Sequence, residues 1–162
     1  MASTLVFGNV DPPAGLGHFI KLASESNHIP SMVAAGVTLI EGIGVIANIH
    51  EGEAWLKKAA DLGSSQAAYE LGCLYYYNEG SDNGNSDADQ KAVAYGYFCK
   101  AIEIANDETD ASPVLVSAIY MKAACLLKGQ GVEPNYFAAL ALLQQAAELG
   151  HVYAQDACRQ LL

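Results

Sequence analysis

The sequence predicts an all-α protein of about eight antiparallel helices wound as a right-handed solenoid, and three observations predict it. Alanine supplies much of the 52% apolar content and favours close-packed helices over strands. Glycine turns recur between the helical segments, where a residue without a Cβ adopts a left-handed conformation at little cost. The same succession of turn, helix and glycine stop returns along the chain, which indicates an internal repeat.

The clearest copy of this repeat covers residues 128–155. Gly129 and Gly131 form its turn, and Pro134 suits the first turn of a helix because its φ is fixed. Gly150 then ends the helix. The unit is therefore a turn, a helix and a stop.

An earlier copy, residues 42–67, matches the first at every compared position. Its turn, large residue, small residues and stop are Gly42, Gly44, Val45, Trp55, Lys58, Ala59, Ala60 and Gly63. A middle copy has its second helix near 89–105 and a longer period, which two insertions, 81–90 and 106–113, explain. Three full repeats are therefore expected.

Another helix precedes each turn, at residues 31–42, 67–80 and 118–131. Small residues recur at the same two places in these helices and allow close contact with a neighbouring helix. They are Ser31, Gly36, Ala67, Gly72, Ala118 and Ala123. We interpret the chain as one domain, 1–162, made of a half-repeat 14–28, repeat 1 (30–66), repeat 2 (67–112), repeat 3 (113–152) and a half-repeat 153–162.

These residues resemble the Sel-1-like repeat family, whose members are relatives of the tetratricopeptide repeats. The family pattern is met by Ala67, Leu71, Gly72 and Tyr75 in one helix, and by the turn, tryptophan and small residues of the 42–67 copy. The resemblance covers about residues 16–162, with Ala35 and Lys122 at places where leucine is usual. It implies a non-catalytic scaffold or adaptor that binds other proteins, often in bacterial signalling, secretion or host contact.

The resemblance also implies a binding face. In tetratricopeptide arrays the first helix of each pair lines the concave side, and the lining positions carried onto this chain give the candidate partner-binding residues. These are Gln66, Tyr69, Cys73, Tyr76, Tyr77, Tyr120, Leu127, Lys128 and Tyr153. Helical spacing independently places Tyr69, Cys73 and Tyr76 on one face. Tyrosine suits interfaces because it buries a large ring and keeps a wet hydroxyl; the alternative is that these rings only fill gaps between helices.

The net charge of -10 argues against nucleic acid and anionic membranes as partners, because both repel a polyanion. It is compatible with a basic protein partner and equally with a merely soluble acidic surface. Some family members are immunity proteins, so a sharper alternative is an inhibitor that binds and neutralises a basic secreted toxin or effector. The acidic insertions, 81–90 and 106–113, are a second candidate binding region or simply solvated loops.

The compartment expected is the cytoplasm. The start of the sequence has no basic segment followed by a long apolar one, so no secretory signal is expected. No apolar stretch approaches the roughly 18 residues of a membrane span. A homo-oligomer stays open, since Leu161 and Leu162 could extend an apolar face.

Motifs for catalysis and metal binding are weak in this sequence. It contains no GxSxG, HExxH or phosphate loop, so we expect no enzyme activity, cofactor or metal. A hydrolase is the alternative, and the only candidate catalytic cluster for it consists of His50, Glu51 and Glu53. Residues 79–90 resemble a calcium loop in outline but lack the first Asp and the last Glu.

The four cysteines, Cys73, Cys99, Cys125 and Cys158, form no CxxC pair. Isolated cysteines on predicted helices are typical of small buried hydrophobic residues. We therefore expect neither disulfides nor metal ligation from them.

Overall fold

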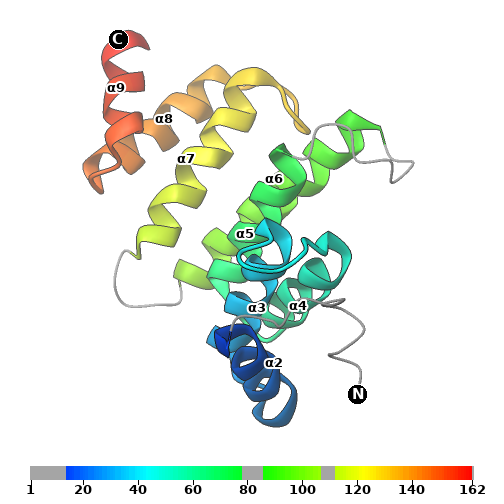
Figure 1. The fold of residues 1–162 in the computed structure, drawn as a ribbon. Helices are drawn as coiled ribbons and strands as arrows, with labels where there is room; N and C mark the ends of the chain where they lie inside the picture. Colours follow the sequence, from blue (N-terminus) through cyan, green and yellow to red (C-terminus); the bar gives the residue numbers. More distant parts are fainter. Residues whose placement is uncertain (1–13, 78–85, 107–111, 162) are drawn as a thin grey trace. The chain divides into compact units, whose positions relative to one another are not determined.

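The structure is a computed structural model that describes residues 14–77, 86–106 and 112–161. Within these ranges it contains eight α-helices and no strand (Figure 1). In chain order they are α2 (Ala14–Ser26), α3 (Ile29–Glu41), α4 (Ile49–Asp61), α5 (Ser65–Tyr77), α6 (Asp87–Asn106), α7 (Pro113–Lys128), α8 (Tyr136–Glu148) and α9 (Val152–Leu161). The all-α prediction is confirmed. The chain forms two compact units, 1–70 and 71–162, and the division falls inside α5.

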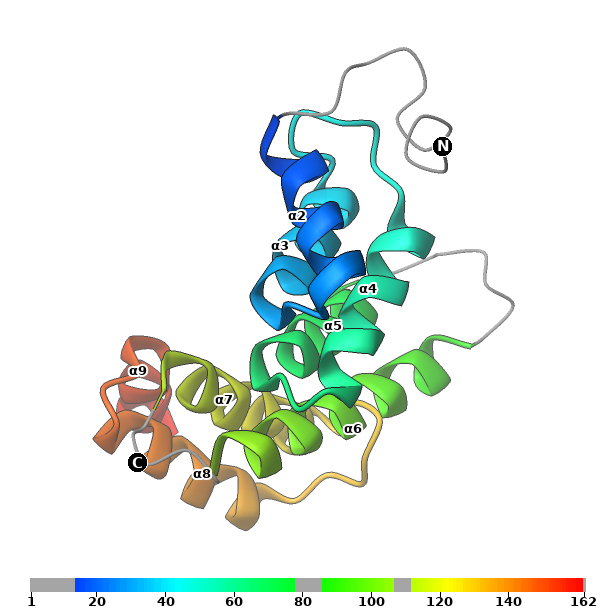
Figure 2. The same cartoon turned by 90° about the horizontal axis from the view of Figure 1, so that it is seen from below.

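In the unit 1–70, α3 packs against both α2 and α4 (Figures 1 and 2). The backbones of α3 and α4 come close because glycines face each other. A Cβ on Gly36 would lie 2.7 Å from Leu56 Cγ, and a Cβ on Gly52 would lie 2.6 Å from the carbonyl oxygen of Gly36. The prediction of close helix contact at Gly36 is confirmed. The core cluster of this unit contains Leu16, Ala35, Leu39 and Val45, with Phe19, Ile20 and Trp55 packed on it.

In the unit 71–162, α7 packs against α6 and α8, and α9 packs against α8 (Figure 2). Gly72 admits the ring of Phe98, since a Cβ there would lie 2.5 Å from Phe98 Cε1. The buried members of the core cluster are Ala105, Leu115, Val116, Ile119, Ala123, Leu143, Ala146 and Ala154. Half of these residues are alanines, whose small side chains let the helices pack at short distances.

The glycine turns have the same backbone geometry in the first and third repeats. The two glycines of each turn have φ near +70° and the stop glycine has φ near +94°, a region that favours glycine. The values are 67°, 71° and 93° for Gly42, Gly44 and Gly63, and 67°, 72° and 95° for Gly129, Gly131 and Gly150. The middle turn, 78–80, lies outside the described residues.

Asparagine N-caps follow the two turns. Asn48 Oδ1 accepts from the backbone N–H of Glu51 at 3.2 Å, and Asn135 Oδ1 accepts from that of Ala138 at 3.0 Å. Each cap satisfies one of the helix's free amide donors. The expectation for Pro134 was wrong: α8 begins at Tyr136, so the proline precedes the cap and packs against the turn at Gly129 instead.

The start of α7 also differs from the sequence prediction. The repeat register places this helix at 118–131, but α7 begins at Pro113, and Ser112 Oγ accepts from the backbone N–H of Leu115 at 3.2 Å. Serine followed by proline is a strong start signal for a helix. As a result α7 has 16 residues, whereas α3 and α5 have 13 each. The additional turn at its N-terminal end shapes the candidate site.

Candidate functional site

Two of the nine predicted partner-binding residues belong to the unit 1–70. Gln66 is exposed and Tyr69 is half-buried, both on α5. The side chain of Gln66 hydrogen-bonds Glu70, whose pKa is raised first by burial and then by the charge of Glu41. The remaining seven residues belong to the unit 71–162, which we describe by itself.

Tyr76 is a correction to the predicted surface, because it is only 8% exposed. Its hydroxyl donates to Gln130 Oε1, and its ring lies 6.3 Å from that of Phe98. The ammonium of Lys91, itself buried, lies 4.8 Å from the centre of the Tyr76 ring and donates to the Tyr76 carbonyl oxygen. These contacts make Tyr76 part of the packing between α5, α6 and the α7–α8 turn, so we remove it from the binding surface.

The neighbouring Tyr77 is 67% exposed. Its hydroxyl donates to the sulfur of Met121 at 3.9 Å. The pKa of Tyr77 is raised, first by partial burial and then by the nearby ionisable groups of Cys73, Tyr120 and Cys125. The structure thus brings the predicted residues Cys73, Tyr77 and Tyr120 into one neighbourhood.

A cluster of three rings continues this surface from α7 to α9. Tyr120 stacks on His151 with centroids 4.4 Å apart, and Tyr153 lies 6.4 Å from Tyr120 and 5.9 Å from His151. We call these three residues the aromatic cluster. Tyr120 is half-buried and packs on the core, whereas Tyr153 is 70% exposed. The cluster therefore combines a fixed base with an exposed edge.

His151 was not singled out from the sequence, where it stands alone. In the structure its Nδ1 accepts from the backbone N–H of Ala154 at 3.2 Å, so the imidazole is the N-cap of α9. Burial lowers the pKa of His151, which favours the neutral ring. The position of His151 in the sequence indicates this cap. It directly follows the stop glycine Gly150 and precedes a helix, and the first repeat has Ser64 at the same place.

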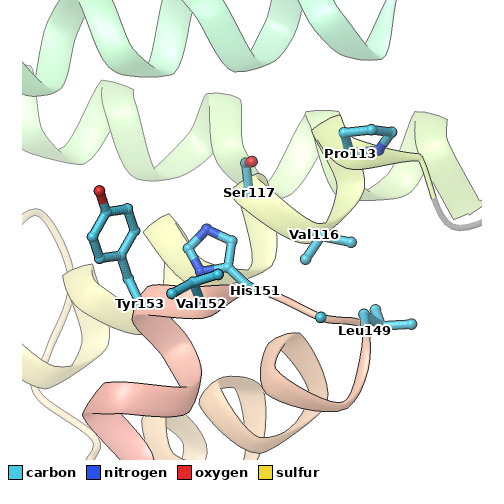
Figure 3. A pocket seen from close by; sticks show the side chains of 8 residues that line it. Pro113, Val116, Ser117, Leu149, His151, Val152 and Tyr153 are labelled. Carbon is cyan, nitrogen blue, oxygen red and sulfur yellow. The ribbon is translucent and has the colours of Figure 1, made fainter.

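A pocket of about 410 Å³ opens beside the aromatic cluster (Figure 3). In this view the imidazole of His151 lies between the side chains of Ser117 and Val152, with Tyr153 at one end and Pro113 and Leu149 at the other. The residues that line it are Pro113, Val116, Ser117, Leu149, Gly150, His151, Val152 and Tyr153. They come from the first two turns of α7, the α8–α9 turn and the first turn of α9. The additional turn of α7 supplies Pro113.

The surface around the cluster carries little negative charge. Residues 71–77 and 113–128 contain no aspartate or glutamate, although the whole chain has a net charge of -10. At the far end of α7, Leu127 and Lys128 are exposed, Leu127 with 36% of its surface. On α9 the carboxylate of Asp156 is paired with Arg159 at 3.2 Å. The acidic character of the chain is therefore located elsewhere.

The other candidate groups have structural roles. Glu51 accepts from Asn48 Nδ2 at 3.2 Å beside the α4 cap, and Glu53 pairs with Lys57 at 2.6 Å. No group of three metal-ligating side chains occurs in the described part of the chain. Most of the calcium-like stretch, 79–90, and the centre of the insertion 106–113 lie outside the described residues.

All four cysteines lie in the described ranges as thiols outside any disulfide: Cys125 is buried, and Cys73, Cys99 and Cys158 are half-buried. None of the helices described is both long and apolar enough to cross a bilayer.

The fold and the surface define a class: an α-helical repeat protein with an exposed aromatic face and a pocket at the end of its helix pairs. Residues 29–64, 65–106 and 116–151 match the family model described as Sel1 repeat. The chain belongs to this family, whose members are generally non-catalytic scaffolds that bind other proteins.

Comparisons with individual proteins agree with this family. The chain is similar to a Sel1 repeat protein from Oxalobacter formigenes, with a TM-score of 0.67, 21% identity, and 90% of this chain and 97% of that one covered. It is also similar to a protective antigen of uropathogenic Escherichia coli with an SLR fold, with a TM-score of 0.68, 25% identity, and 86% and 26% covered. These solved structures share the solenoid fold.

A curated relative is the chitin synthase regulator SKT5 of Saccharomyces cerevisiae, which is 29% identical over 150 residues. The match covers 93% of this chain and 20% of the yeast protein. The chain thus spans about a fifth of the length of this relative.

Proposed function

We propose that the chain is a non-catalytic scaffold that binds a segment of another protein on the face formed by Tyr77, Tyr120, His151 and Tyr153. The observation that carries the proposal is the aromatic cluster next to a 410 Å³ pocket. Partner-binding residues that dominate affinity are enriched in tyrosine and cluster beside pockets. Truncating one of them typically costs about 2 kcal/mol of binding free energy, or roughly 30-fold in affinity.

The name of the yeast relative, a chitin synthase regulator, supports a scaffold whose partner is an enzyme. Binding to an enzyme is the part of a regulator's role that we extend to this chain. We do not extend chitin synthase itself to this chain, because the match covers only 20% of the yeast protein.

A basic toxin or effector, as in the immunity hypothesis, would need a different surface. The proposed face has no carboxylate on α7, and the acidic residues of the insertions 81–90 and 106–113 would have to supply the attraction. Binding at an uncharged aromatic face should change little with ionic strength, whereas binding through exposed charges should weaken steeply as salt screens them. Salt dependence therefore separates the two functions.

The experiment compares partner capture from native extract by the wild type and by a Tyr77→Ala, Tyr153→Ala double variant. Both side chains are mostly exposed, so the fold should be retained, and circular dichroism checks it. The matched control is Tyr136→Ala with Phe137→Ala, which removes two exposed aromatic rings from α8. We expect a partner that the wild type and the control retain and the double variant loses. Equal retention by all three proteins would exclude this face.

A further inference from the structure

We propose that the pocket at the first turns of α7 and α9 takes one uncharged, apolar side chain of the bound segment, and that the backbone carbonyl beside this side chain accepts a hydrogen bond from His151 Nε2. This inference rests on the proposed function and names the part of the partner that the face recognises. Leucine and methionine are side chains of suitable size and chemistry.

The walls of the pocket favour an apolar occupant. Pro113, Val116, Leu149 and Val152 supply aliphatic surface, and none of the eight lining residues carries a formal charge at neutral pH. Two of these walls, Leu149 and Val152, are exposed to 41% and 64% and would be covered by the occupant. Burying an aliphatic side chain of this size raises affinity by about 10- to 100-fold over an alanine.

The first-turn amides of the two helices offer few donors to an anion, because one amide of each helix is already used by its side-chain cap. The N–H of Leu115 donates to Ser112 Oγ, and the N–H of Ala154 donates to His151 Nδ1. Pro113 has no N–H at all. A carboxylate would therefore lose its hydration and gain only part of the amide donors that usually hold anions at helix N-termini. A cationic side chain is disfavoured as well, since two helix N-termini carry partial positive charge.

The imidazole of His151 supplies the polar contact, a hydrogen bond from Nε2 to a backbone carbonyl of the bound segment. Its Nδ1 accepts from a backbone N–H and so carries no proton, which places the proton of the neutral ring on Nε2. Among the described residues Nε2 has no hydrogen-bond partner. The ring is held in place by stacking on Tyr120 from α7 and by Tyr153 from α9, the titratable groups that contact it. A fixed donor beside an apolar pocket suits a peptide carbonyl, which every partner segment provides.

Two features that build the pocket in the third repeat are absent from the corresponding place in the first repeat. The additional turn of α7 brings Pro113 to its wall, and α3, the corresponding helix of the first repeat, begins without such a turn. At the place of His151 the first repeat has Ser64, whose Oγ accepts from the N–H of Ala67 at 3.1 Å. Serine satisfies the same cap but offers no ring and no second nitrogen.

The test uses the full chain and a phage-displayed library of random heptapeptides as the probe. We expect the enriched peptides to share a leucine, methionine or similar residue, and its replacement by lysine or aspartate to weaken binding about 10- to 100-fold. Val152→Glu, which places a carboxylate at the pocket wall, should remove this preference. Its matched control is Ile49→Glu, because Ile49 is also an exposed apolar residue at the first position of a helix. An acidic side chain is compatible with both helix N-termini, so both variants should fold.

The role of the imidazole is tested with His151→Asn. Asparagine keeps the cap, as Asn48 and Asn135 do in this chain, but removes the ring. We expect weaker peptide binding and the loss of the pH dependence of the wild type. Protonation of Nδ1 removes the acceptor of the Ala154 N–H and so releases the ring, and wild-type affinity should therefore fall at pH values below the lowered pKa of His151. Unchanged affinity and pH profile in His151→Asn would overturn the hydrogen bond to His151.

The outcomes separate the pocket from the wider proposal. If enriched peptides depend on Tyr77 and Tyr153 but share no apolar residue and ignore Val152→Glu, the scaffold stands and the pocket proposal is wrong. If they share an acidic residue or need a free carboxyl terminus, the pocket takes an anion and the proposal is also overturned. If no peptide is enriched, titration with N-acetyl-leucine-N′-methylamide followed by NMR decides: no shift at His151 and Val152 refutes the pocket proposal by itself.

Discussion

Replacing Gly72 by alanine should destabilise the unit 71–162, although alanine is the better helix former. The new Cβ would lie 2.5, 2.7 and 3.1 Å from three carbons of the Phe98 ring. Phe98 is completely buried, and its ring also contacts Tyr76, so it has little room to move. Overpacking of this kind costs about 2 kcal/mol, and the gain in helix propensity offsets about 1 kcal/mol of it. The net loss of unfolding free energy should be about 1 kcal/mol.

The matched control is Gly96→Ala on α6, two residues before Phe98. Nothing lies within 4 Å of a Cβ at Gly96, so only the gain in propensity remains, and this variant should be stabilised by about 1 kcal/mol. The two glycine-to-alanine changes should therefore shift the free energy of unfolding in opposite directions, and the two values should differ by about 2 kcal/mol. Urea unfolding followed by helical circular dichroism measures both values.

A second variant tests the assigned cause. In a Phe98→Leu background the ring that Gly72 admits is gone, so Gly72→Ala should cost less than in the wild type, with a coupling energy of about 1 kcal/mol or more. Additive effects of the two substitutions would show that the Phe98 ring is not the obstacle. Equal stabilisation by Gly72→Ala and Gly96→Ala would refute the close approach of α5 and α6 altogether.

Two further predictions concern a cap and a thiol. Asn135→Ala should lower the unfolding free energy by about 1 kcal/mol because the N–H of Ala138 loses its acceptor, whereas Asn135→Ser should be nearly neutral; urea unfolding distinguishes them. The thiol of Cys125, whose pKa is raised to about 11 first by burial and then by Cys99, should react with Ellman's reagent at pH 8 about 100-fold more slowly than an ordinary cysteine. A rate in the folded protein equal to that in urea would contradict this protection.

The glycine geometry could be predicted from the sequence because backbone conformation and residue type are tightly linked there. Only glycine adopts φ near +70° or +95° at low cost, so equal spacing of glycines in two copies required equal turns. Gly36 and Gly72 were predictable for a related reason, since a missing side chain in the same register marks a close approach of two helices. These positions depend on one residue and its own backbone.

The burial of Tyr76 could not be predicted in this way. Its neighbour Tyr77 has the same chemistry and was assigned to the same surface, yet one ring is 8% exposed and the other 67%. The difference comes from Phe98 and Lys91 on α6, which pack on one of the two rings. A helical period identifies which residues share a face, but the exposure of a residue at the edge of that face depends on side chains from another helix.

The start of α7 was missed because the period of the short copies was extended into a repeat with insertions. Ser112 and Pro113 end the insertion 106–113 in the repeat register, but in the structure they form a cap and a first helical residue. Local capping chemistry overrides a repeat register, since each helix begins where its amide donors find acceptors. This difference of one turn places Pro113 in the wall of the pocket.

The shared features of the repeats account for the fold, and the differences account for the site. Gly63 and Gly150 end their helices in the same way, and Ser64 and His151 both accept an amide three residues later. The frame of the repeat therefore requires only a hydrogen-bond acceptor after the stop glycine. A histidine meets that requirement with one nitrogen and holds the other for a partner on a rigid ring, whereas serine offers only its short hydroxyl. We infer that recognition by this chain depends on such substitutions at positions where the fold accepts more than one side chain.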